Sequence, residues 1–223
     1  MKNRLIYFFT LFLVALSIFT GCAFSLSGIR GSGVLKTEVR EVTTFSTISF
    51  KSVGKLKIQQ TGKESLTIIA DENILPILES RVSDQTLYIN NINPSNIDPT
   101  NPIEFLVEVK NLENLYTKSV GSIEVNGIQG KRLSVSLDGV GSMAITGNVD
   151  VLDLELTGVC SFNGEELKTK QATVHNNKGV GNAIVNVSEQ LDASVSGIGS
   201  IEYIGSPQVT ESVKGIGKIK ERS

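Results

Sequence analysis

The sequence predicts an all-β protein, specifically a parallel β-helix, or β-solenoid, with short strands, glycine corners and a coil period of about 19 residues. Three observations predict this fold class. A Gly-Val/Ile-Gly-Ser-apolar motif recurs, the residues between its copies alternate apolar and polar, and the second half of the chain has no helical pattern. The motif is centred on Gly121, Gly141, Cys160, Gly181, Gly199 and Gly217, at intervals of 20, 19, 21, 18 and 18 residues. A unit of this length cannot bury its apolar edge alone, so we expect the units to stack.

The first 21 residues have the pattern of an export signal. Lys2 and Arg4 precede an apolar or hydroxyl-bearing run from Leu5 to Thr20, and small residues follow it. This run is shorter than the roughly 20 residues of a membrane-spanning helix. We therefore predict a signal peptide over residues 1–21, with a permanent membrane helix as the weaker alternative, and a tether over residues 22–37.

The end of this segment, IFTGC, resembles the bacterial lipoprotein box, in which the cysteine is acylated and becomes the first residue of the mature chain. Gly21 and Cys22 match that pattern, whereas Phe19 stands where an aliphatic residue is preferred. The resemblance implies lipidation of Cys22 and a membrane anchor through it. The alternative is ordinary secretion with a free or paired thiol. No acidic run follows Cys22, so in a bacterium with two membranes we expect the outer membrane, facing the periplasm, with the cell surface as the alternative.

The remaining chain reads as one domain over residues 38–220, less regular over 38–114 and built of regular coils over 115–220. The less regular part contains five strand-like segments: FSTISF from Phe45, GKLKIQQ from Gly54, SLTIIA from Ser65, TLYI from Thr86 and EFLVEV from Glu104. Asp71 to Val82 looks helical, but its proline should limit it to about one turn. Asn90 to Pro102 is rich in Pro and Asn and predicts an exposed loop.

Along each regular coil the side chains alternate between the interior and the solvent. Leu133, Val135 and Leu137 are expected inward, and Ser134, Ser136 and Asp138 outward. Glu211 breaks an inward column, and we expect it to lie in water because it belongs to the last full coil. The motif glycines are expected at corners that need a positive φ.

These segments together resemble the bacterial GIN domain family, catalogued as auto-transporter adhesin head domains, and the resemblance covers about residues 38 to 220. It is carried by the F-x-x-I-x-F strand at Phe45 to Phe50, by the stretch SLTIIADENILPILESRV with TLYI after it, and by the repeated GVGS corners. The resemblance implies a β-helical fold, often exported on a lipoprotein signal. It implies no catalytic or binding residue, because the family has no established molecular activity.

Composition argues against several classes of function. Lys plus Arg is 21 and Asp plus Glu is 23, so no positive excess is available to neutralise a nucleic acid backbone. The chain has one His and no Trp, which disfavours His-based catalysis and imidazole metal sites. Cys160 occupies a place that glycine takes elsewhere, and we expect a small buried thiol there. We therefore predict no enzyme activity, no catalytic residue, no metal and no cofactor.

The outward polar columns are the candidate binding face. Short polar side chains at a regular spacing suit sugar hydroxyls or a partner protein. The residues are Ser134, Asp153, Glu155, Thr173, His175, Asp192 and Ser194. The leading hypothesis is a non-enzymatic envelope lipoprotein that acts as an interaction scaffold for a glycan or an envelope protein, with a homo-oligomer left open. The alternatives are a polysaccharide-active enzyme and a purely structural subunit.

Overall fold

The structure is a computed structural model that describes residues 28–92, 97–176 and 179–222. The predicted signal peptide, Cys22 and the first residues of the predicted tether lie outside the described residues. No helix in the described part is long and apolar enough to cross a membrane.

The described chain is nearly all strand, which confirms the all-β prediction. Its one helical element is a single 3-10 turn, η2 (Leu75–Ile77), with a proline in its first turn, as the sequence predicted. Thirteen of the strands form one mixed sheet, and β1 and β8 form a separate pair. The strands are β1 (Ile29–Arg30), β2 (Leu35–Arg40), β3 (Thr47–Lys51), β4 (Val53–Gln60), β5 (Ser65–Asp71), β6 (Leu78–Ser83), β7 (Thr86–Asn91), β8 (Ile97–Asp98), β9 (Glu104–Val109), β10 (Asn114–Leu156), β11 (Val159–Asn176), β12 (Val180–Val195), β13 (Ile198–Ile204), β14 (Gln208–Val213) and β15 (Ile216–Glu221).

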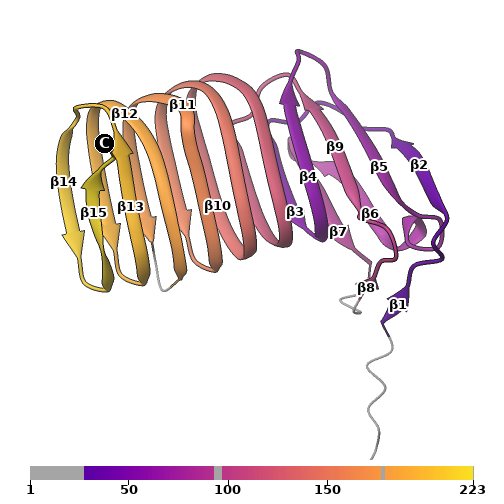
Figure 1. Cartoon of the computed structure of the whole chain (residues 1–223). Coiled ribbons are helices and arrows are strands. Elements are labelled where there is room, and N and C mark those ends of the chain that lie inside the picture. Colours follow the sequence, from indigo (N-terminus) through magenta and orange to yellow (C-terminus); the bar gives the residue numbers. More distant parts are fainter. Residues whose placement is uncertain (1–27, 93–96, 177–178, 223) are drawn as a thin grey trace, which may run out of the picture.

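From β10 to β15 every strand pairs in parallel with a neighbour about one motif interval away. Val140 pairs with Val159, Val159 with Val180, Val180 with Ile198, and Ile198 with Ile216. These offsets of 19, 21, 18 and 18 residues are the intervals between copies of the repeated motif. Figure 1 shows the successive turns lying side by side, and we call each turn a rung.

The part before Asn114 is less regular, as expected, because parallel and antiparallel pairs mix there. β4 lies between β10 and β9 in parallel, but β5 and then β2 continue that edge in antiparallel pairs. On the other edge β3 lies between β10 and β7 in parallel, and β6 joins β7 antiparallel. We call β2, β5 and β6 the amino-terminal cap, since they end the stack opposite β14 and β15 (Figure 1).

The predicted loop over residues 90–102 is partly wrong. β7 runs to Asn91, and Ile97 and Asp98 form β8, which pairs with β1. Asp71 explains how this segment is held: its buried carboxylate accepts hydrogen bonds from the Asn101 side chain at 2.6 Å, the Thr100 backbone N–H at 2.9 Å and the Gly33 backbone N–H at 3.1 Å. Burial raises the pKa of Asp71, but these hydrogen bonds outweigh it and bring the pKa below the ordinary aspartate value.

The core follows the predicted alternation. Leu133, Val135 and Leu137 are buried, and the outward residues between them are not. Glu211 pairs with the buried Ala193 and is itself exposed, which confirms that the terminal rung leaves it in water.

The glycines differ in part from expectation. Gly141 has a positive φ of 156°, but Gly181 is not among the residues with positive φ, so the corner explanation is wrong there. What the two share is close contact between rungs. A Cβ atom on Gly141 would lie 1.8 Å from the Gly121 carbonyl oxygen, and one on Gly181 would lie 1.9 Å from the Cys160 carbonyl oxygen. At these two positions the backbone of the preceding rung occupies the space that a side chain would take.

Candidate functional site

The predicted binding face lies on one outer side of the rungs, where β10, β11 and β12 run in parallel. Asp153, Thr173 and Asp192 are register partners in one column of this face. In the neighbouring column Glu155 pairs with His175, and His175 with Ser194. Ser134 lies at a half-buried outward position of β10, between the buried Leu133 and Val135. The register pairs thus bring six of the seven predicted residues onto the same outer side, and Ser134 occupies an outward position of β10.

One hydrogen bond joins neighbouring rungs across this face. His175 Nδ1 lies 2.6 Å from Ser194 Oγ, and both side chains are half-buried. An acid, an imidazole and a hydroxyl in one column have the composition of a hydrolytic triad. β11 is paired on both sides by β10 and β12, so its backbone N–H groups are engaged in the sheet instead of facing a bound carbonyl. Within the described residues, the column has the residue types of a triad without a backbone oxyanion hole on β11 beside them.

Cations accompany the carboxylates around this face. Arg132 forms an ion pair with Asp153, and Lys170 Nζ lies 2.8 Å from Asp150 Oδ1. The hydrogen bond to Asp150 raises the pKa of Lys170, with the negative charge adding to it. Asp153 and Asp192 are two rungs apart, about 10 Å by strand spacing. Among the described residues no three His, Cys, Asp or Glu side chains are grouped so that they could hold a metal ion.

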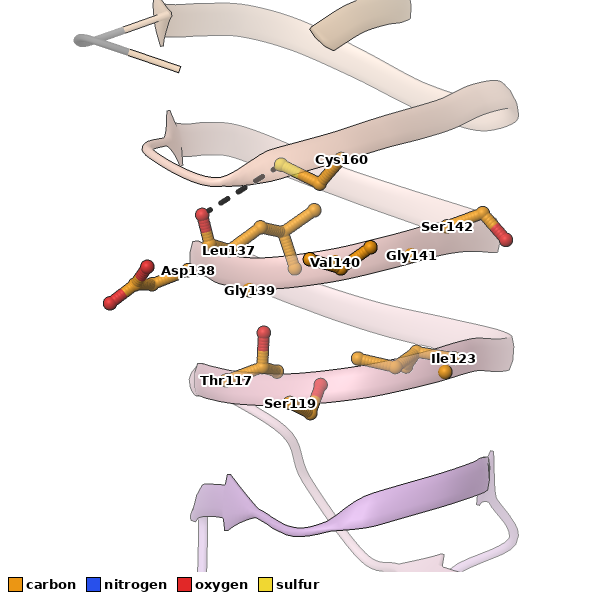
Figure 2. A pocket seen from close by; sticks show the side chains of 11 residues that line it. Thr117, Ser119, Ile123, Leu137, Asp138, Gly139, Val140, Gly141, Ser142 and Cys160 are labelled. Atoms are coloured by element: carbon orange, nitrogen blue, oxygen red, sulfur yellow. Dashed lines mark hydrogen bonds between the residues drawn. The ribbon is translucent and has the colours of Figure 1, made fainter. Parts of the chain in front are cut away.

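Cys160 is the small buried thiol that the sequence predicted. Figure 2 shows it in the strand beside Gly141, with its sulfur directed at the Leu137 carbonyl oxygen, 3.9 Å away. The side chain is 8% exposed, and burial raises the pKa of the thiol above its ordinary value. The neutral thiol is therefore favoured over the nucleophilic thiolate.

Two tyrosines extend the polar face, and sequence reasoning missed both. Tyr116 is 46% exposed and pairs with Ser49, which pairs in turn with Tyr88. The guanidinium of Arg81 stacks on the Tyr88 ring, 4.2 Å from its centroid. The Ser134 backbone N–H donates to the Glu113 carbonyl oxygen at 2.8 Å, which aligns this strand of β10 with the next rung and its binding-face residues. Tyr88 was hidden because the register before residue 114 does not follow the repeat, whereas Tyr116 was missed although it lies at the start of β10.

A second outward feature was also missed. Each motif places an aliphatic residue between two small ones, and these aliphatic residues are exposed. We call them the aliphatic ridge: Val120, Val140, Val159, Val180, Ile198 and Ile216, which are 48–72% exposed. The sequence signal was the residue between the two small residues of each motif, which is always Val or Ile. The expectation of glycine corners accounts for the glycines but not for this residue.

Comparison with known proteins places the fold. A family model described as "Putative auto-transporter adhesin, head GIN domain" matches residues 44–207. The chain is similar to the crystal structure of a "putative adhesin" from Bacteroides fragilis, with 26% identity and a TM-score of 0.70 over 87% of this chain and 100% of that one. It also shares its fold with a "Putative lipid binding protein" from Parabacteroides distasonis, with 21% identity and a TM-score of 0.53 over 87% and 99%. No curated protein matches the chain.

The family match includes strands of the cap, the aromatic core beside it and most of the rungs, and so spans the polar face as a whole. The relatives with adhesin names are consistent with an envelope-associated protein. By this match, the chain belongs to the GIN domain family.

Proposed function

We propose that the protein is a non-enzymatic scaffold of the bacterial cell envelope, a β-solenoid whose polar face binds a glycan. The observation that carries this proposal is the registered array of short polar side chains on parallel strands, from Asp153, Thr173 and Asp192 to Glu155, His175 and Ser194. Rungs about 4.8 Å apart repeat the same donors and acceptors, so an extended ligand meets equivalent groups along its length. Such a ligand is itself a repeating chain.

The chemistry of the face favours a neutral polyol. Arg132 engages Asp153, so the charge of that carboxylate is compensated within the protein. Ser and Thr hydroxyls both donate and accept hydrogen bonds, as sugar hydroxyls do. Tyr116 and Tyr88 are two register steps apart, about 10 Å, and present aromatic rings with a polar end, which suit the mixed apolar and polar faces of a sugar.

The alternatives predict different behaviour. A polysaccharide-active enzyme needs two carboxyl groups held about 5 to 10 Å apart on either side of the scissile bond. Asp153 and Asp192 stand in the same column of one sheet face, which offers no opposite side for the second group. A purely structural subunit would bind no glycan at all.

The binding test uses a glycan array and soluble envelope polysaccharides with the wild-type chain. The variant combines Asp153→Ala, Glu155→Ala, His175→Ala and Asp192→Ala, and the matched control combines Asn163→Ala and Glu202→Ala, outward positions on the other side of the rungs. We expect binding by wild type and control, loss of at least about tenfold in affinity in the variant, and similar melting temperatures. No binding by wild type to any glycan would contradict the glycan proposal. If wild type cleaves a polysaccharide and the variant does not, the protein is an enzyme and the scaffold proposal is wrong.

We also propose that Cys22 carries the lipid that anchors this scaffold, at the outer membrane facing the periplasm where the host has two membranes. The sequence before Cys22 supports it, and lipidation supplies the two hydrophobic signals that stable anchoring needs. Cys22→Ser should abolish labelling by a fatty-acid analogue and release the protein from membranes. A wild-type protein that is unlabelled and soluble would refute the anchor. If protease added to intact cells removes the protein, the protein lies on the cell surface instead of facing the periplasm.

A further inference from the structure

The aliphatic ridge is an outward row that the fold itself does not require. Its residues lie one per rung in direct register, from Val159 to Val180, Ile198 and Ile216. At the other end Val120 pairs with the half-buried Val53, which continues the row to a seventh position. Two residues after the ridge, the outward positions of the rungs are occupied by Ser142, Ser161 and Asn182. These neighbouring exposed positions therefore carry polar side chains, unlike the ridge.

Glycine columns border the ridge on both sides. Gly141, Gly181 and Gly199 follow it, and Gly139, Gly158 and Gly179 precede it. The contact between rungs explains these glycines, because a Cβ atom on Gly199 would lie 1.7 Å from the Gly181 carbonyl oxygen. It does not explain the exposed Val or Ile between them.

The missing side chains leave grooves beside the ridge. One groove is lined by Val159, Val180 and Ile198 together with the residues that follow them, which are Cys160, Gly181 and Gly199. A second is lined by Val53, Val120 and Val140 together with Ser119 and Gly139, which precede the ridge. Figure 2 shows Gly139, Val140 and Gly141 in sequence along one rung. The surface is therefore a narrow apolar rib flanked by channels beside which glycines stand, with the small side chains of Ser119 and Cys160 in the same columns.

We propose that this ridge is the contact surface between two copies of this chain, packed side by side. A second copy carries the same ridge and the same channels at the same axial spacing, so every rung of one copy finds an equivalent rung in the other. The proposal goes beyond the glycan-binding role, because the ridge and the polar face are separate columns and either can exist without the other.

Two-fold symmetry fixes how the copies lie. A two-fold axis parallel to the stack of rungs sets each ridge into the partner's channel on the same glycine side, so both copies make the same contact. An axis perpendicular to the stack would set ridge against ridge and leave the channels empty. The geometry therefore points to parallel copies, with both amino-terminal caps at the same end.

The size of the surface agrees with this packing. Seven ridge positions span about 29 Å at about 4.8 Å per rung, and a standard interface buries about 800 Å² on each partner. Contact between ridges alone would cover one column per copy. Seating each ridge in a channel also covers the glycine columns and the serine column beyond them, which brings the buried area toward that value. The ridge and its glycine columns carry no charge, while Lys51 and Lys118 line the groove at the amino-terminal end of the ridge.

Single cysteines test the arrangement. Val120→Cys, Val140→Cys or Ile198→Cys is introduced into the full chain carrying Cys160→Ala, and intact cells are oxidised before non-reducing electrophoresis. Each of the three should give a band of doubled mass, because identical ridge residues lie beside the two-fold axis within reach of a disulfide. The parent chain sets the background from Cys22, and Thr173→Cys on the polar face is the matched control.

Each other outcome overturns the proposal. Cross-links between Val120→Cys and Ile198→Cys chains, without cross-links within either, would show antiparallel copies. A band of some other mass would show a different partner, and no band above the control would show no contact. In purified full chain, the doubled mass should fall to that of one chain in Val140→Asp with Val159→Asp, while Asn126→Asp with Asn148→Asp, at exposed positions outside the ridge and the columns beside it, should leave it doubled. If both pairs melt like wild type and neither changes the mass, the ridge is not the interface.

Discussion

In the strands before residue 114 the core is built on Phe45, Phe50 and Phe105, whereas the rungs beyond Phe162 are filled by side chains such as Ala172, Ala183 and Val195. The rings of Phe50 and Phe105 meet edge to face, with centroids 5.1 Å apart. In the carboxy-terminal rungs these small residues pair with larger aliphatic ones, Ala172 with Leu191 and Ala183 with Ile201. The two regions thus bury their interiors with side chains of very different size.

This difference shows how the core of a repeated unit depends on the rungs above and below it. An interior rung is covered above and below by copies of itself, so small side chains fill the space between parallel strands. The first rungs have no copy on their outer side, and there the antiparallel strands β2 and β5, together with the large rings on β3 and β9, close the gap. The next four predictions test this contrast, from the largest expected effect to the smallest.

Phe105→Ala should destabilise the protein by about 3 to 5 kcal/mol, because it removes a fully buried ring and leaves a cavity. Val174→Ala in the rungs should cost about 2 kcal/mol, the value of two buried methyl groups. Denaturant unfolding followed by circular dichroism measures both. Equal losses would mean that the aromatic core contributes nothing special to the closing of the stack.

Gly141→Val should cost about 3 kcal/mol or more, because its side chain would have to displace the Gly121 carbonyl of the adjoining rung. Ser136→Val, which decorates a half-buried outward position, should change stability by less than about 0.5 kcal/mol. Thermal melting of the two variants beside wild type gives the comparison. Matching shifts would contradict the close contact between rungs.

Acid should loosen the two ends differently. The pKa of Asp71 is lowered in the folded state, so its contribution is complete above the ordinary aspartate value near 3.9 and is lost as pH falls through the lower folded value. Glu202 at the other end follows the same sign, since its hydrogen bond with Lys220 lowers its pKa. Asp71 is fully buried and Glu202 is not. Asp71→Asn should therefore reduce the loss of unfolding free energy at acidic pH much more than Glu202→Gln does. Unfolding midpoints of wild type and both variants at pH 7, 5 and 3 measure this effect. A larger change in acid sensitivity in Glu202→Gln than in Asp71→Asn would contradict the prediction.

Deleting Ser200 to Gly217 should have the smallest effect. Gly199 and Gly217 are register partners, so Lys218 can follow Gly199 in the same column and one complete rung is lost. We expect β-type circular dichroism to persist and the melting temperature to move by a few degrees, about 5 °C or less. Global unfolding of the shortened chain would show that the rungs are not interchangeable.

The regular rungs could be predicted because identical residue types stand at positions that pair. The alternation around Leu133 and Val135, the thiol of Cys160 and the exposure of Glu211 all follow from the column to which each residue belongs. The cap could not be predicted in this way. Whether β5 runs parallel or antiparallel to β9 depends on contacts such as Leu66 with Val107, 41 residues apart, and no repeat specifies that register.

The candidate site divides along the same line. The seven polar residues could be placed in columns from the period, whereas Tyr88 joins the face through β7 and β3, before the repeat begins, and Tyr116 pairs with β3 from the first residues of β10. The residues of the aliphatic ridge are the Val or Ile of each motif and could be seen in the sequence. Their exposure could not be predicted, because it depends on how closely the backbones of neighbouring rungs approach each other.

The exposed carboxylate of Glu211 has a consequence for filament growth. Among the described strands, β14 and β15 are each paired on one side, and such an edge is a template onto which another chain can add. A chain that added there would have to bury Glu211, and also Glu221, which stands in the column of the half-buried Tyr203. Burying an unpaired charge is strongly unfavourable. The two glutamates therefore make the last rung a poor seed for end-to-end polymerisation, in a protein whose parallel repeat would otherwise favour it.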